Sequence, residues 1–236
     1  VEMHISEIGF CSGHSASGVF VDEFARTTVP GLYAAGDMAN VPHNYMLGAF
    51  TNGAIAGEHA MGYADDVELA DFDAADVALE RERVMAPTKR EDGIPPNQIE
   101  YKTRRLVNDY LQPPKVTKKY HLGQQRFAEV REDLEQGMMV RNSHELLRSL
   151  EAASILDCAD MAAHASLFRT ESRWGLYHLR SDYPEKDNEN WFCHALLGKE
   201  NGKMVSEKHA VSDYVVPIAE DEKDLYDKQR VAASAS

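Results

Sequence analysis

Apolar residues recur at helical spacing in three segments between residues 97 and 171. Steps of three and four residues place such side chains on one face of an α-helix, the face that packs into a core. Pro113-Pro114 ends the first segment, Gly137 or the residues after it end the second, and Asn142 with Glu145 predicts a capping box at the start of the third. Three amphipathic helices of this length predict an antiparallel bundle. The predicted apolar faces are Ile99, Leu106, Val107, Tyr110 and Leu111 in the first helix; Phe127, Val130, Leu134 and Met138 in the second; and Leu147, Leu150, Cys158, Met161, Ala165 and Phe168 in the third.

A weaker pattern precedes the bundle. Residues 65–96 are acidic and rich in alanine, and their few apolar residues predict one helix over Asp73–Met85. Pro87 ends that helix, and a polar loop leads to Pro96, which begins the next one. We interpret the charges of this connector as a solvated face.

Short apolar runs replace helical periodicity in residues 1–64. Pro30-Gly31 indicates a turn before the run Leu32–Ala35, which is typical of a strand buried on both faces. Two more short strands are expected, over Met3–Phe10 and Val19–Asp22. A helix is predicted over Met46–Ala64, and its many glycines and alanines favour the close approach of another backbone or of a ring.

The junction between that strand and that helix carries candidate chemistry. Gly36 would let a ligand approach the backbone, and the Asp37 carboxylate would accept hydrogen bonds from neutral hydroxyls such as those of a ribityl chain. The free N–H groups of the first helical turn, Leu47–Thr51, carry partial positive charge, which suits the ring edge of a reduced flavin. The same residues fit an ordinary buried turn in which Asp37 only caps the chain, and the spacing alone does not separate the two interpretations.

Residues 172–236 contain one predicted hairpin and a tail. The strands Trp191–Leu197 and Lys203–Lys208 flank a turn at 198–202 that is rich in glycine. Ala210–Ile218 is predicted to be a further extended strand, and the acidic and Ala-Ser residues after it to be a polar tail.

Composition narrows the class of partner. A net charge of −14 argues against binding to nucleic acid, which requires clustered Lys and Arg. Cys11, Cys158 and Cys193 are odd in number and far apart, so they predict no disulfide framework and no iron–sulfur ligand set, and a reducing, cytoplasmic location is expected. His144, His164 and the Met and Cys positions of the bundle are expected to be core or surface residues, so no metal site is predicted. No apolar run approaches about 18 residues, so no membrane span is expected.

Three stretches carry a family resemblance. TTVPGLYAAGD at 27–37 and PHNYMLGAFTNGAIAG at 42–57 resemble the last FAD-binding segment of the flavoproteins grouped with fumarate reductase, succinate dehydrogenase and L-aspartate oxidase. Residues 171–191 are similar to the pattern E-S/T-R, R-x-D-Y-P, D-x-x-N-W that follows the helical domain of that group. Within the group, the alpha subunit of adenylylsulfate reductase looks most similar, because it shares the Trp after Arg173 and the spacing from Arg173 to Asp182.

The resemblance implies a fold and its domain limits. The expected class is α+β and mainly helical: the end of an FAD-binding α/β domain at 1–64, the acidic connector at 65–96, the helical bundle at 97–171, and an extension with a hairpin and tail at 172–236. The chain has no G-x-G-x-x-G turn for the FAD pyrophosphate. We therefore expect it to be the carboxyl-terminal portion of a larger flavoprotein, which by itself holds FAD weakly.

The resemblance also implies site residues. Asp37 would meet the ribityl chain of FAD, and the residues near the flavin would be Gly36, Asp37, Leu47, Gly48, Phe50, Thr51 and Asn52. His14 and Arg173 are the candidate catalytic residues, since a histidine can orient an anionic substrate or pass a proton. His14 equally fits a solvated loop, and Arg173 equally fits an arginine–carboxylate network that fixes helices to the flavin domain. Met46 stands where fumarate reductases carry an arginine that grips a dicarboxylate, which argues against succinate or fumarate as the substrate.

Two functions from different classes follow. The first is an FAD-dependent oxidoreductase that passes electrons between a small anionic substrate and an iron–sulfur subunit, contacted through the chain's end. The second is a non-catalytic docking or assembly module that binds a partner subunit. The expected partners are the flavin and capping portion of the protein, an iron–sulfur subunit and a second copy of the chain.

Overall fold

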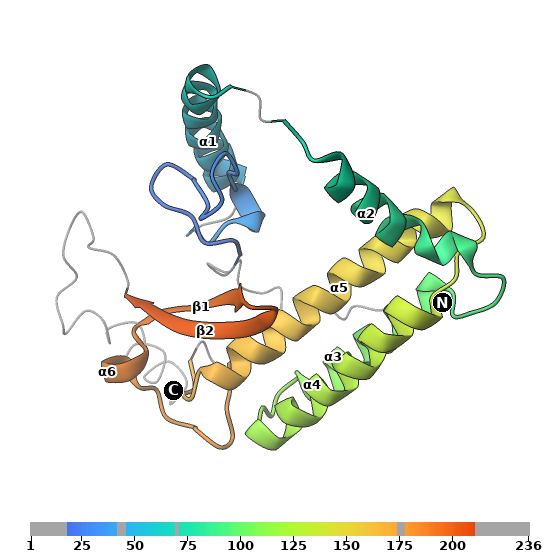
Figure 1. Ribbon diagram of the computed structural model, residues 1–236. Coiled ribbons are helices and arrows are strands. Elements are labelled where there is room, and N and C mark those ends of the chain that lie inside the picture. Colours follow the sequence, from blue (N-terminus) through green and yellow to red (C-terminus); the bar gives the residue numbers. More distant parts are fainter. Residues whose placement is uncertain (1–17, 42–45, 69–70, 174–177, 211–236) are drawn as a thin grey trace.

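The computed structural model describes residues 18–41, 46–68, 71–173 and 178–210 (Figure 1). Within them the chain forms six α-helices and one two-stranded sheet, so it is mainly helical, as the sequence predicted. The predicted strand Met3–Phe10, the loop with His14, residues 211–218 and the tail lie outside the described residues.

Three long helices form the bundle: α3 (Pro96–Tyr110), α4 (Thr117–Glu132) and α5 (Ser143–Phe168). Each packs on the other two, and short loops make consecutive helices run in opposite directions (Figure 1). Pro96 begins α3, where its missing N–H leaves no bond unmade. A single π-helical turn, η3 (Asp133–Gly137), extends α4 and ends at the glycine that the sequence singled out.

The cap of α5 is built from the two predicted residues. The Asn142 carboxamide oxygen accepts a hydrogen bond from the Glu145 N–H at 2.9 Å. The Glu145 carboxylate in turn accepts one from the N–H of Arg141 at 2.7 Å, so it reaches one residue further back than a standard capping box. Both bonds satisfy donors at the helix start and fix where α5 begins.

The core lies where the three helices meet. The predicted faces of α3 and α4 are confirmed, because Ile99, Leu111, Phe127, Val130 and Met138 are buried there. The predicted face of α5 is wrong at Leu147, Leu150, Cys158 and Met161, which are exposed, while its other two members, Ala165 and Phe168, are partly buried. Small residues occupy its buried face instead, because they allow α5 to lie close to two neighbouring helices at once. The buried residues of α5 are Ser149, Ala152, Leu156, Ala159 and Ala163.

The connector joins the bundle through a tight contact at its end. Helix α2 (Ala74–Met85) begins at Asp73, whose carboxylate accepts a hydrogen bond from the Ala75 N–H at 2.7 Å, and the 3₁₀ turn η2 (Ala86–Lys89) follows. Gly93 has a φ of +154°, and a Cβ there would lie 2.3 Å from the Gly137 carbonyl oxygen. Only glycine therefore lets this loop lie against η3.

The amino-terminal part differs from the prediction at one point. Helix α1 (Met46–Asp66) forms as expected. The predicted strand Leu32–Ala35 does not, since Tyr33 makes only an isolated bridge to Arg26 and Leu32 is half exposed. A strand requires a neighbour to pair with along its length, and the described residues supply none beyond that bridge. The predicted strand Val19–Asp22 is likewise reduced to one bridge, between Val19 and Ala39.

The hairpin consists of strands β1 (Cys193–Glu200) and β2 (Lys203–Ala210), which pair antiparallel and pack on α5. Asn201 and Gly202 have φ values of 50° and 78°, which match a two-residue turn of type I′. The predicted turn was longer, and Trp191 lies in the short helix α6 (Asn188–Trp191) instead of in a strand. Asp187 caps that helix, because its carboxylate accepts a hydrogen bond from the Asn190 N–H at 3.0 Å.

The two kinds of leucine on α5 provide a test of this packing. Leu156 is 0% exposed and Leu147 is 55% exposed. Leu156→Ala should lower the free energy of unfolding by about 2–5 kcal/mol, because it leaves a cavity between three helices. Leu147→Ala, the matched control, should cost less than about 1 kcal/mol. Urea denaturation followed by circular dichroism measures both, and equal losses would contradict the assigned face.

Candidate functional site

The predicted flavin turn and the start of α1 lie in contact. Gly36 begins the 3₁₀ turn η1 (Gly36–Met38), is buried and has a φ of +67°. A Cβ at this position would lie 3.3 Å from the Cβ of Ala49, in the first turn of α1. The structure therefore brings together the turn and the helix start that the sequence placed nine residues apart.

Two of the predicted cofactor residues on α1 have exposed apolar side chains, and two have polar side chains that bond to the backbone of the helix. Leu47 and Phe50 are 81% and 72% exposed, and their i, i+3 spacing puts them on neighbouring positions of the helix surface. The Thr51 hydroxyl donates to the Leu47 carbonyl oxygen at 2.9 Å, and the Asn52 amide donates to the Gly48 carbonyl oxygen at 2.9 Å. The first turn thus offers an apolar surface next to polar groups that are bonded to their own helix.

These residues fit a flavin. The Asp37 carboxylate is exposed directly beside the buried Gly36, so it is available to hydroxyl donors. Met46, Leu47 and Phe50 give the exposed apolar area that an aromatic ring system would cover. The first turn of α1 contains no acidic residue, so no side-chain charge of that turn opposes the partial positive charge of its N–H groups.

The second predicted region is centred on the buried carboxylate of Glu171. It accepts hydrogen bonds from Arg169 at 2.7 Å, from Arg173 at 2.6 and 3.0 Å, and from the Asp187 N–H at 2.8 Å. Burial by itself would raise the pKa of Glu171, but the bonds from Arg173, Asp187 and Arg169 outweigh it and hold the pKa below its usual value. Glu171 is therefore a charged anchor for the segment after α5.

Arg180 is the other centre of this region, and it is 0% exposed. Its guanidinium donates to the carbonyl oxygens of Ser166 and Arg169 at 2.7 and 3.0 Å, and to the Thr117 hydroxyl at 2.8 Å. It also forms a two-pronged pair with the Asp182 carboxylate at 2.8 and 2.9 Å. The hydrogen bond from Arg180 is the main cause that lowers the pKa of Asp182 far below its usual range.

Two further basic groups lie near Arg180. The Nε2 atom of His178 lies 3.3 Å from the Arg169 carbonyl oxygen. Burial is the main cause that lowers the pKa of Lys115 to about 8, and the charge of Arg180 lowers it further. Apart from its position after two prolines, nothing in the sequence singled out Lys115, because its burial depends on the returning segment at 178–182.

The predicted catalytic pair is not brought together in the described residues. His14 lies outside them. Arg173 bonds to Glu171 and also donates to the Asn188 carboxamide oxygen at 2.8 Å, so its guanidinium is engaged on two sides. These bonds agree with the interpretation of Arg173 as part of an arginine–carboxylate network, which here extends to Asn188 on α6. A role of Arg173 in binding substrate stays a prediction.

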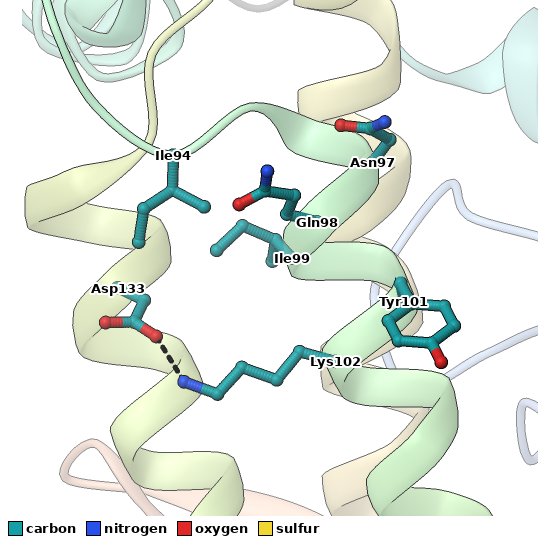
Figure 2. A pocket seen from close by; sticks show the side chains of 7 residues that line it. All are labelled: Ile94, Asn97, Gln98, Ile99, Tyr101, Lys102 and Asp133. Carbon is teal, nitrogen blue, oxygen red and sulfur yellow. Dashed lines mark hydrogen bonds and ion pairs between the residues drawn. The ribbon is translucent and has the colours of Figure 1, made fainter.

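A separate hollow of about 660 Å³ lies on the bundle, between α3 and η3 (Figure 2). An ion pair between Lys102 and Asp133 at 2.5 Å crosses one side of it. None of the predicted site residues lines it, so it belongs to the bundle surface. Its lining residues are Ile94, Asn97, Gln98, Ile99, Tyr101, Lys102 and Asp133.

A metal centre and a membrane span are two further kinds of site, and the described ranges contain neither. No group of three or more His, Cys, Asp or Glu side chains there is arranged to hold a metal ion. None of the helices in the described part of the chain is both long and apolar enough to cross a membrane.

Solved structures define the class of protein. Adenylylsulfate reductase from Archaeoglobus fulgidus superposes with a TM-score of 0.77 and 26% identity over 83% of this chain and 34% of its own. E. coli quinol fumarate reductase, at 22% identity, shares the fold with a TM-score of 0.77 over 87% of this chain and 38% of its own. The arrangement is thus that of the carboxyl-terminal part of fumarate-reductase-type flavoproteins, as the resemblance predicted.

The family follows from the sequence match. This chain belongs to the fumarate reductase flavoprotein C-terminal family, whose model matches residues 103–223. The fumarate reductase flavoprotein subunit of Mycobacterium tuberculosis H37Rv is 28% identical over 206 residues, which cover 78% of this chain and 34% of that relative. L-aspartate oxidase 1 of Ralstonia nicotianae is 27% identical over 181 residues, which cover 73% of this chain and 32% of that relative. The chain spans about a third of the length of these relatives.

Protonation of His178 should destabilise the fold in acid. Burial lowers the pKa of His178 to about 4, and the charges of Lys115, Arg169 and Arg180 add to the effect. The unfolded chain binds this proton near pH 6.5, so the folded state is at its full stability above that pH. As the pH falls from about 6.5 to 4, this group should remove roughly 3 kcal/mol of stability.

A neutral replacement separates this effect from general acid unfolding. His178→Gln keeps a polar side chain but cannot titrate, so the loss of stability between pH 6.5 and 4 should become smaller. His144→Gln, which removes an exposed histidine at the start of α5, should behave like the wild type. Urea denaturation across this pH range measures all three, and an unchanged slope in His178→Gln would refute the assignment.

Loss of the buried Arg180 guanidinium should lower the stability of the fold. Arg180→Met removes the ionic partner of the Asp182 carboxylate and a donor to the carbonyl oxygens of Ser166 and Arg169, so the free energy of unfolding should fall by about 3–5 kcal/mol. Arg126→Met breaks an exposed pair with Glu129 and should change it by less than about 1 kcal/mol. Denaturant unfolding of both variants tests this, and a small effect at Arg180 would contradict its role as an anchor.

Proposed function

We propose that this chain is the carboxyl-terminal part of an FAD-dependent oxidoreductase. The contact between Gly36 and Ala49, with the exposed Asp37 beside it, is the observation that carries the proposal. It joins a carboxylate for the ribityl hydroxyls to a helix start whose N–H groups favour negative charge. Family membership supports it, because the matched relatives are named as flavoprotein subunits.

The residues of this chain would bind and orient the cofactor. Gly36 gives access to the backbone, Asp37 accepts from the ribityl chain, and Leu47, Gly48, Phe50, Thr51 and Asn52 line the ring. FAD, when bound, supplies two-electron chemistry toward a substrate and one-electron exchange with an iron–sulfur partner. Exposed apolar side chains around Phe50 would exclude water from the ring on this side.

The substrate we propose is a small anion. Met46 provides no positive charge where an arginine would grip a dicarboxylate, so an anion other than succinate or fumarate is favoured. His14 and Arg173 are the candidates on the substrate side, and the Glu171 network fixes Arg173. Unpaired Cys158 and Cys193 agree with a cytoplasmic, reducing location.

The proposed organisation keeps four parts: the flavin segment at 1–64, the connector at 65–96, the bundle at 97–171 and the extension at 172–236. The remaining flavin and capping portion, an iron–sulfur subunit and a second copy of the chain are the proposed partners. The length of the matched relatives supports the first of these, because this chain spans only a third of it.

A docking module is the second candidate function. Large apolar side chains are exposed along α1 and the connector, and they mark a surface that another polypeptide could cover. In this interpretation the chain binds a partner subunit and has no turnover of its own. The exposed residues are Met46, Leu47, Phe50, Met61, Val67, Phe72, Val77 and Leu79.

A flavin titration separates the two functions. We expect the chain to quench the fluorescence of added FAD, with weak affinity. Asp37→Ala should weaken binding by about tenfold or more, because charge-assisted hydrogen bonds are lost. Gly53→Ala, on a face of α1 where a Cβ meets nothing within 4 Å, is the control and should bind like the wild type. A chain that stays a stable oligomer and never binds flavin would instead support the docking module.

A further inference from the structure

The flavin-type segment, residues 18–41, rests on the hairpin through two histidines. The Asn40 amide nitrogen lies 3.3 Å from Nδ1 of His194 on β1. The Phe20 ring meets the ring of His209 on β2 edge to face, with centroids 4.7 Å apart. Figure 1 shows this segment, in blue, directly above the two orange strands.

The two histidines form one unit because of the strand register. His194 and His209 are directly paired across the hairpin, and paired residues of an antiparallel ladder point to the same face. Their ring centroids lie 6.5 Å apart. A charge on either ring is therefore felt by the other.

The charged groups around His194 are positive. His194 faces His209 on β2 and Arg169, which follows α5. The Arg169 guanidinium donates to the Trp191 and Cys193 carbonyl oxygens at 2.8 and 2.7 Å. The 18–41 segment offers it only the neutral Asn40. Burial, then His209, then Arg169 lower the pKa of His194. The docked arrangement thus favours a neutral imidazole.

The hydrogen bond from Asn40 fits the same protonation state. The amide of Asn40 donates to Nδ1, so this nitrogen carries a lone pair and the ring proton is on Nε2. A protonated Nδ1 would face another donor. Turning the amide would bring Oδ1 to the new proton, but it would break the bond that the amide nitrogen makes to Nδ1 in the docked arrangement.

We propose that His194, with His209 paired beside it, is a proton-sensitive clamp that holds the 18–41 segment, and with it the Asp37 turn, against the hairpin. A neutral His194 ring keeps the segment docked, and protonation of His194 releases it. Helix α1 follows the segment, because the Tyr33 hydroxyl donates to the His59 carbonyl oxygen at 3.2 Å and Gly36 packs on Ala49. This clamp goes beyond the proposed function, since it requires no flavin.

A distance measurement on the whole chain tests the clamp. Nitroxide labels at Glu58 on α1 and Lys199 on β1, both exposed, would be placed in a background with Cys11, Cys158 and Cys193 replaced by serine. Pulsed dipolar spectroscopy should give one narrow distance near about pH 7.5 and a broader, longer distribution near about pH 5.5. Each unit of difference between the docked and undocked pKa of His194 changes the docking equilibrium about tenfold.

Variants identify the responsible groups. His194→Gln still accepts from Asn40 but cannot titrate, so its distance should stay narrow at both pH values. His209→Gln removes a neighbour that lowers the pKa of His194, so this chain should open less than the wild type. His144→Gln, which removes an exposed histidine at the start of α5, should open like the wild type. Circular dichroism confirms that each variant is folded, and His209→Gln decides the question if His194→Gln is not.

Two results would overturn the clamp: a wild-type distribution that is the same at both pH values, or full opening in a folded His194→Gln or His209→Gln chain. The measurement contains no flavin. Failure of the clamp is therefore distinguishable from failure of FAD binding, which the fluorescence titration reports separately.

Discussion

The buried guanidinium of Arg180 is the interaction on which the carboxyl-terminal part of the fold depends. A buried charge costs several kcal/mol unless hydrogen bonds and an opposite charge surround it. Arg180 meets this condition only where the end of α5 and the Thr117 hydroxyl at the start of α4 come together around it. The chain after α5 must therefore fold back onto the bundle, at one place and in one orientation.

A second set of contacts connects the bundle to the turn at Gly36 and Asp37. Arg169 follows α5, binds Glu171 and also holds the carbonyl oxygens of Trp191 and Cys193, so the arginine network fixes where β1 begins. The register of β1 with β2 then sets His194 beside His209, and these two rings receive the 18–41 segment. A continuous series of contacts thus joins the helical core to the Asp37 turn.

Local signals explain what the sequence could predict. The helices of the bundle, the cap at Asn142 and the end at Gly137 depend on spacing and on residues within one or two turns, so the pattern was sufficient. The buried face of α5 was not predictable in the same way. A search for large apolar residues selects Leu147 and Met161, which are exposed, while the close contact of three helices selects Ala152, Ala159 and Ala163. The choice between them depends on the neighbouring helices, and one helix's sequence does not contain that information.

Non-local partners explain what the sequence missed. Leu32–Ala35 has the composition of a buried strand, but a strand exists only where another segment pairs with it, and the described residues offer Tyr33 a single bridge. The run is nevertheless covered on one side, because Leu32 is half exposed while Tyr33, Ala34 and Ala35 are partly buried and Gly36 is buried. Gly31 lies against Tyr63 and Gly36 against Ala49, so contacts along α1 supply this burial without a paired strand. An apolar run alone therefore does not distinguish a strand from a segment that packs on a helix, and the distinction depends on a neighbour that lies later in the chain.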